Sequence, residues 1–392
     1  MALRTSRRRW PVISALGLVQ IFTWGSTFYL PTILAEPIAA DTGWPLAGVV
    51  GALSAGLLTA GLVSPAVGTA IARHGGRPVL AAGCALIAAG LAVLALAPSL
   101  AVFYAGWLLL GCGMAAGLYD PTFATLGRLY GQSARSAITA LTLWGGFAST
   151  VCWPLSTLLL ESVGWRGTAA AYAGFHLVVS LPLVLWFIPR AEHPAGVPRP
   201  RAADPEALTG RDRTHFRLMA AILVLTGLVF VILSVHLLTF LRAQGYPLAV
   251  AVGLGALFGP AQVGARVLEM ASGGRHHPIW TLAAAAGSAT AGLILLAADA
   301  RLPGLALVLF GAGNGLLSIA RGSLPLALFG AERYPGVMGL LARPALIAQA
   351  AAPMVGAALI GWVGPAEALV AIAVLMVANC VLVLLLWRDL RH

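Results

Sequence analysis

Long apolar segments separated by short polar gaps run along the whole chain. A hydrocarbon core about 30 Å thick needs about 20 apolar residues per helical crossing. Backbone groups in lipid must be paired within their own segment, which favours helices over open strands. The pattern predicts an all-α membrane protein with twelve transmembrane helices, near residues 10–35, 45–72, 78–97, 100–128, 135–160, 167–188, 216–242, 247–272, 278–298, 303–330, 335–362 and 366–387.

The two sets of six segments repeat one another at an offset of about 200 residues, the signature of an internal duplication. The matched elements are Gly43–Ala47 with Gly245–Ala249, Leu110–Gly113 with Phe310–Gly313, and Pro154 with Pro353. We therefore expect two six-helix bundles related by a pseudo-two-fold axis along the membrane normal. The predicted domains are an N-terminal bundle at 1–188, a polar cytoplasmic linker at 189–215 and a C-terminal bundle at 216–392.

Composition excludes a soluble protein, because 59% of the residues are hydrophobic and only 9% are charged, against about 25% charged in a typical soluble domain. The net charge of +11 comes from 24 basic residues, all of them Arg. Most lie in short gaps between apolar segments, where they orient a membrane protein, so no nucleic-acid partner is predicted. The excess of arginines in the gaps on one side of the membrane predicts a multi-pass protein of the inner (plasma) membrane with both termini cytoplasmic. The first apolar segment exceeds a signal-peptide core, so we expect an uncleaved helix.

No cofactor, metal or catalytic centre is predicted from the sequence. The four cysteines lie in apolar segments without metal-ligand spacing, which is typical of packing residues. The chain has no Lys, hence no Walker-type phosphate loop, and we do not expect ATP hydrolysis. An enzyme or an energy-coupled permease subunit is disfavoured on these grounds.

One polar gap carries a recognisable motif. The stretch 68–77, with Gly68, Arg73, Gly75 and Arg77, resembles the GxxxDRxGxR signature of the major facilitator superfamily. This resemblance implies that fold across essentially the whole chain, and transport of a small solute by alternating access. Ala72 stands where the family has Asp, so the charge relay of the motif lacks its carboxylate.

Two further stretches resemble the monocarboxylate and oxalate carriers of that superfamily. The first is Trp24-Gly25 with 29–31 and 42–45, and the second is the stretch from Gln262 to Arg266. The second resembles a D-x-x-x-R pattern whose Arg neutralises the substrate carboxylate. Gln262 replaces that Asp, so the proton handling of the pattern is not implied. The GPxxGG pattern of multidrug antiporters is absent after Pro154, which makes drug antiport less favoured.

Few ionisable residues fall inside the predicted helices, and each costs about 2.5 to 3.5 kcal/mol to insert, so each should face a partner or a wet cavity. Arg266 is the first candidate substrate ligand, because a guanidinium matches a carboxylate bidentately. The alternative is local pairing with Glu269, three residues further along the same helix. Glu269 is therefore also a candidate coupling residue.

Asp120 and Arg321 nearly correspond under the repeat. They could form a salt bridge that breaks during transport and so biases the conformational equilibrium, or a fixed structural pair. Asp120 is also the preferred proton site, and Arg321 a second anion ligand. Arg343 is a candidate gating residue, with headgroup anchoring as the alternative. His236 could couple protons, or simply pack by a hydrogen bond.

Neutral side chains complete the candidate site. Gln262 and Asn314 could hydrogen-bond the substrate, although polar links between helices explain them as well. Trp24, Tyr29 and Tyr119 could wall an organic-solute cavity, or could serve packing alone.

The sequence thus predicts a monomeric secondary active transporter of a small organic anion such as a monocarboxylate, with protons as a candidate coupling ion. The alternative is a proton-coupled efflux transporter for a toxic or hydrophobic compound.

Overall fold

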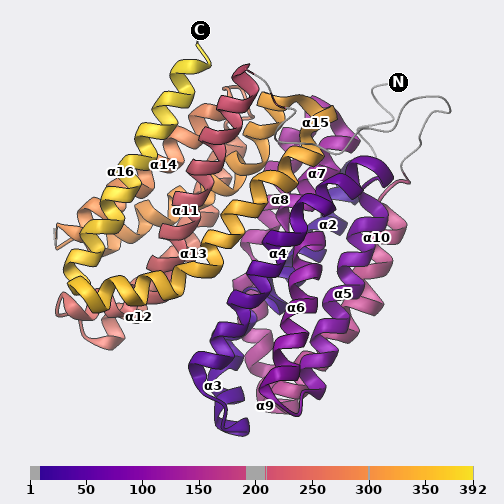
Figure 1. Cartoon of the computed structure of the whole chain (residues 1–392), viewed down its shortest axis with the longest axis vertical. Helices are drawn as coiled ribbons and strands as arrows, with labels where there is room; N and C mark the ends of the chain where they lie inside the picture. Colours follow the sequence, from indigo (N-terminus) through magenta and orange to yellow (C-terminus); the bar gives the residue numbers. More distant parts are fainter. Residues whose placement is uncertain (1–8, 191–207, 209, 299–300, 392) are drawn as a thin grey trace. The chain divides into compact units, whose positions relative to one another are not determined.

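The computed structural model describes residues 9–190, 208, 210–298 and 301–391, and over these residues the chain is almost entirely helical, without strands. Figure 1 shows the helices in chain order. They are α2 (Arg9–Ser26), α3 (Leu30–Thr42), α4 (Leu46–His74), α5 (Gly76–Leu96), α6 (Leu100–Gly117), α7 (Tyr119–Tyr130), η1 (Gly131–Ser133), α8 (Ala134–Gly146), α9 (Ala148–Phe175), η2 (His176–Ser180), α10 (Leu181–Phe187), α11 (Gly210–Ala243), α12 (Leu248–Gly255), α13 (Phe258–Ala271), α14 (Pro278–Ala297), α15 (Pro303–Val363) and α16 (Pro365–Asp389).

Within the described part of the chain, nine helical stretches are long and apolar enough to cross a membrane. The two longest, Leu100–Phe187 and Pro303–Val363, contain 88 and 61 residues. At 1.5 Å per residue the longer one would extend about 130 Å, several times the hydrocarbon thickness. Non-helical residues interrupt both, at Gly164 and Gly330. Each stretch therefore holds more than one crossing, and twelve crossings remain our prediction.

At least four predicted helices are broken where we expected them to be continuous, among them 135–160, which divides into α8 and α9, and 247–272, which divides into α12 and α13. In two others, proline is the physical reason. The segment 10–35 divides into α2 and α3 before Pro31, and the segment 100–128 divides into α6 and α7 at Leu118, before Pro121. Proline lacks an N–H, and its ring clashes with the carbonyl four residues earlier. A break upstream of the ring removes that clash.

The chain divides into two compact units. Unit 1 contains residues 1–205 together with Phe329–Arg343, and unit 2 contains 206–328 together with Pro344–His392. Most of the predicted linker at 189–215 lies outside the described residues. The segment Phe329–Arg343 is part of α15 and packs within unit 1.

Glycines bring the helices of unit 1 into backbone contact. A Cβ atom added to Gly111 of α6 would lie 2.4 Å from the Gly56 carbonyl oxygen of α4. One added to Gly113 would lie 2.8 Å from the Ile87 backbone nitrogen of α5. These approaches place α6 against α4 and α5 (Figure 1). Large buried side chains, among them Phe103, Trp107 and Tyr172, fill the core of this unit.

Unit 2 repeats the same use of glycine. A Cβ on Gly311 of α15 would lie 2.9 Å from the Phe258 carbonyl oxygen of α13, and one on Gly313 would lie 2.7 Å from the Ala285 carbonyl oxygen of α14. The matched glycines of the sequence repeat thus contact matched neighbours in each unit. An apolar cluster that includes Phe230 and Phe310 forms the core.

Candidate functional site

Arg266 is a buried cation on α13. Its side chain is 5% exposed, and its Nε donates a long hydrogen bond of 3.4 Å to the Gly315 carbonyl of α15. One Nη donates to Gln262 Oε1, one turn earlier on α13, at 3.4 Å. Gln262, which replaces the acidic residue of the resembled pattern, therefore contacts the guanidinium as a neutral acceptor. The structure brings these two predicted residues together.

Glycine at position 315 is what allows α15 to approach Arg266. A Cβ there would lie 2.4 Å from the Gln262 carbonyl oxygen, closer than real Cβ contacts occur, so a larger residue would push α13 away. Asn314, the neighbouring candidate, is half-buried on α15, as is Arg321 two turns further along. The predicted candidates of unit 2 thus lie on α13 and α15.

Glu269 has partners from the next helix and loop. Its Oε1 accepts a hydrogen bond of 2.7 Å from Thr281 of α14 and lies 3.2 Å from His276 Nε2. His276 and Thr281 also hydrogen-bond one another at 3.2 Å. Neither partner was part of our sequence interpretation, because Thr281 lies 12 positions away on another helix and His276 lies in the loop between the helices, so no helical spacing indicates these contacts. The carboxylate therefore ties the start of α14 to α13.

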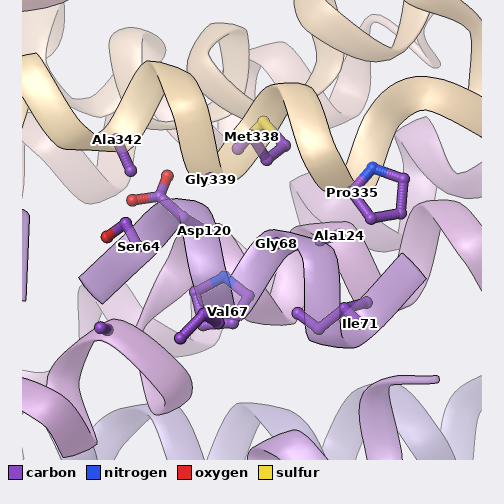
Figure 2. Close-up of a pocket in the computed structure, with 12 residues that line it drawn as sticks. Ser64, Val67, Gly68, Ile71, Asp120, Ala124, Pro335, Met338, Gly339 and Ala342 are labelled. Carbon is purple, nitrogen blue, oxygen red and sulfur yellow. The ribbon is translucent and has the colours of Figure 1, made fainter. Parts of the chain in front are cut away.

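Asp120 lies in the first turn of α7, within unit 1. Its side chain lines a small pocket with Ser64 and Gly68 of α4 and with Met338 and Gly339 of α15. Figure 2 shows the carboxylate pointing toward the 329–343 segment, with the Ser64 hydroxyl beside it. Arg321, its predicted partner, belongs to unit 2. A switchable Asp120–Arg321 pair therefore stays a prediction.

The motif at 68–77 forms the junction between α4 and α5. Gly75 ends α4 with a positive φ of 83°, a conformation that suits glycine. Arg73 is exposed and Arg77 is half-buried. A Cβ on Gly68 would lie 2.6 Å from the Pro335 carbonyl oxygen and 3.1 Å from the Gly339 Cα. Gly68 therefore serves close contact between α4 and the 329–343 segment.

Arg128 is a residue that sequence reasoning missed. From the last turn of α7 it donates to the carbonyls of Ile71, at 3.0 Å, and Ala72. Both carbonyls lie in the last turn of α4. The Ile71 carbonyl also accepts from the Gly75 N–H at 2.9 Å, so the Arg128 cation adds a charged donor at this helix end and complements the helix dipole. Ala72 thus binds Arg128 through its backbone carbonyl, although it lacks the carboxylate that the motif has at this position. A basic residue in a last helical turn was the available signal.

The aromatic candidates gather in unit 1. The ring of Trp24 lies 5.1 Å from that of Tyr119 and 6.1 Å from that of Tyr29. Tyr119 also stacks on Phe123 at 5.1 Å, and its hydroxyl donates to the Thr142 carbonyl at 3.4 Å. The structure therefore brings Trp24, Tyr29 and Tyr119 together, from α2, the α2–α3 turn and α7.

The two remaining candidates are His236 and Arg343. His236 of α11 is half-buried, and its Nε2 lies 3.1 Å from the Pro353 carbonyl, which is the packing arrangement named as its alternative. Arg343 is exposed at the end of the 329–343 segment.

Comparison with known proteins identifies the family. A family model described as Major Facilitator Superfamily matches residues 16–342. The chain belongs to this superfamily. Among curated relatives, rat monocarboxylate transporter 3 is 29% identical over 305 residues, which is 73% of this chain and 60% of that protein. Human monocarboxylate transporter 11 is 29% identical over 59% of this chain and 47% of that protein. The chain thus spans about half to three-fifths of the length of these relatives.

Solved structures share the superfamily fold. The human organic anion transporter MFSD10 (TETRAN) matches with a TM-score of 0.75 at 18% identity, over 96% of this chain and 99% of that one. The fucose transporter FucP in its outward conformation, whose E. coli protein is a fucose:proton symporter, matches with a TM-score of 0.75 at 14% identity, over 95% and 98%. The chain therefore has the major facilitator fold, and its relatives are membrane transporters and not enzymes.

Proposed function

We propose that the protein is a secondary active transporter of a small organic anion, of the monocarboxylate type, that works by alternating access. Arg266 binds the substrate carboxylate. Protons are the proposed coupling ion, as in the fucose symporter, with Asp120 as the group that binds them. The proposed location is the inner (plasma) membrane, with both termini cytoplasmic and the protein a monomer.

The observation that carries this proposal is the burial of a guanidinium on a membrane helix, at 5% exposure. Such a charge costs about 2.5 to 3.5 kcal/mol to insert at the centre of a membrane helix. Ionisable residues at such positions therefore usually serve a function, such as binding a substrate or an ion. Gln262 and Gly315 hold the group from two sides. Preorganised donors spend little entropy when a carboxylate arrives. The names of the relatives, monocarboxylate transporters and an organic anion transporter, support the same ligand class.

Ligand-dependent thermal stability tests the proposal, because a ligand that binds only the folded protein raises its apparent stability. Detergent-purified protein is melted with a panel of monocarboxylates, inorganic anions and cationic drugs, and the panel is repeated with Arg266→Gln. Arg275→Gln is the matched control, because Arg275 carries the same charge but is exposed in the α13–α14 loop. We expect monocarboxylates to stabilise the parent protein and the control, with at least a tenfold loss of affinity in Arg266→Gln.

Stabilisation by cationic or neutral compounds alone, unchanged in Arg266→Gln, would refute the anion-carrier proposal and favour the efflux alternative. Uptake of the stabilising acid into proteoliposomes, with and without an inward proton gradient, then tests the coupling ion. An uptake rate that is the same with and without the proton gradient would show that protons are not the coupling ion.

A further inference from the structure

The break between α6 and α7 exposes a backbone carbonyl that another helix satisfies. Pro121 has no N–H to donate to Gly117, four residues earlier, so that carbonyl loses its helical partner. Gln20 of α2 takes the place of the missing donor, because its Nε2 donates to the Gly117 carbonyl at 2.6 Å. The same nitrogen donates to Thr122 Oγ1 at 2.9 Å. Since the Gly117 oxygen only accepts, these bonds fix which amide atom is nitrogen.

Three polar atoms beside this break are buried and have no hydrogen-bond partner among the described residues. They are Gln20 Oε1, Thr23 Oγ1 and Trp24 Nε1. Spaced i, i+3 and i+4, their side chains share one face of α2. Gln20 and Thr23 are 0% exposed. A buried polar atom without a partner costs about 1 to 3 kcal/mol, so three together call for a ligand.

All three side chains lie close to the break. The Gln20 amide contacts Gly117 directly. Thr23 Cγ2 lies 3.7 Å from the position of a Cβ on Gly117, and the Trp24 ring lies 5.1 Å from that of Tyr119 on the other side of the break. The three side chains that carry the unpartnered atoms therefore lie beside one short stretch of backbone.

Their chemistry selects the ligand. Gln20 Oε1 only accepts, Trp24 Nε1 only donates, and the Thr23 hydroxyl does both. A metal cation would be repelled by the indole N–H, and a carboxylate by the amide oxygen. A hydroxyl group donates one hydrogen bond and accepts others, so it complements all three. A site with two to four polar partners is also what a buried water needs.

We infer that Gln20, Thr23 and Trp24 form a binding site for one hydroxyl group, supplied by a water molecule or by the hydroxyl of a bound solute. The solute form rests on the proposed function, because its probes are carboxylates. The water form does not.

Radiolytic hydroxyl footprinting of the full-length protein tests the water form, because a bound water generates radicals that oxidise the nearest aromatic ring. Trp107 is the matched control. Its Nε1 is likewise buried and unpartnered among the described residues. The Trp107 side chain is buried whereas Trp24 is half-buried, so the Thr23→Val variant separates bound water from exposure. Trp107 lies in an apolar cluster with Phe103, where a lone donor cannot hold a water. We expect Trp24 to be oxidised several-fold faster than Trp107, and Thr23→Val to remove most of the difference.

A matched pair of acids, lactate and propionate, tests the solute form, because they differ by one hydroxyl. Losing one hydrogen bond should lower the lactate preference of Thr23→Val about fivefold, as read from thermal stabilisation. Thr59→Val is the control, because that hydroxyl bonds only its own helix, to the Ala55 carbonyl. Thr23→Val itself should melt close to the parent, because Oγ1 has no protein partner among the described residues and the bound hydroxyl would keep its contacts with Gln20 and Trp24.

Faster Trp24 oxidation without a change in acid preference assigns the site to water, and a changed preference assigns it to the solute. If Trp24 is oxidised no faster than Trp107 and Thr23→Val keeps the parent preference, the inference is wrong. If no carboxylate stabilises the parent protein, the proposed function fails, and footprinting still decides this site.

Discussion

The glycine contact between α4 and the 329–343 segment makes a quantitative prediction. In Gly68→Ala the new methyl would lie 2.6 Å from the Pro335 carbonyl oxygen. Because that neighbour is backbone, it cannot rotate away as a side chain would, and the segment itself must move. Overpacking of this kind costs about 1 to 3 kcal/mol. Replacing a helical glycine with alanine returns about 1 kcal/mol in helix propensity, so we expect a net loss of up to about 2 kcal/mol.

Thermal unfolding of the purified protein measures this loss, with Gly174→Ala as the control. Gly174 also lies within a helix of unit 1, but no atom lies within 4 Å of its Cβ position. Only the propensity gain applies there, so Gly174→Ala should be more stable than the parent by about 0.5 to 1 kcal/mol. The two substitutions are chemically identical and should shift the unfolding temperature in opposite directions.

The double variant with Gly339→Ala sharpens the test. A Cβ on Gly339 would lie 2.5 Å from the Ser64 carbonyl oxygen and 3.1 Å from the Gly68 Cα, in the same contact. Once one methyl has displaced the segment, the second methyl meets a gap that is already open. The double variant should therefore lose less unfolding free energy than the sum of the losses in the two single variants. If Gly68→Ala is as stable as Gly174→Ala, the close contact does not exist and the reasoning is refuted.

Two further substitutions test other contacts. In Gly315→Ala the methyl would lie 2.4 Å from the Gln262 carbonyl oxygen, so displacement of α13 should weaken carboxylate binding about tenfold, or ~1.4 kcal/mol, with Arg266 intact. Thermal-shift titration beside Gly287→Ala, an open helical position, measures this, and equal affinities would contradict it. Arg128→Gln removes charged donors from the Ile71 and Ala72 carbonyls and should cost about 1.5 to 3 kcal/mol of unfolding free energy. Arg128→Lys should lose less, and equal unfolding temperatures for parent and both variants would exclude a capping role.

The lengths of the apolar segments were enough to predict most helices, because lipid requires every backbone group to be paired within its own segment. The predicted segment 45–72 is α4, from Leu46 to His74, and 366–387 is α16, from Pro365 to Asp389. The breaks could not be predicted in the same way. Pro65 and Pro154 remain inside α4 and α9, whereas Pro31 and Pro121 follow breaks. Whether a proline ends a helix depends on donors from neighbouring helices, which local sequence does not contain.

The candidate site was predictable in its residue types but not in its pairings. Arg266 and Gln262 lie one turn apart, so helical spacing alone brings them together. The bond from Arg128 to the Ile71 carbonyl joins residues 57 positions apart, and Glu269 meets Thr281 across a loop. Such contacts depend on how helices pack, so one sequence can mark Arg128 as a basic residue in a last helical turn but does not indicate which carbonyls it meets.

The proline break also links two distant positions in what each will tolerate. Gln20 is needed at the Gly117 carbonyl only while residue 121 cannot donate an N–H. With an ordinary residue at 121, the helix could supply that bond itself, and an apolar residue at 20 would then be acceptable. Replacing Gln20 alone with an apolar residue should therefore be harmful, whereas the same replacement beside an ordinary residue at 121 should not be. Although about a hundred residues separate them in sequence, positions 20 and 121 should vary together among relatives that keep this break.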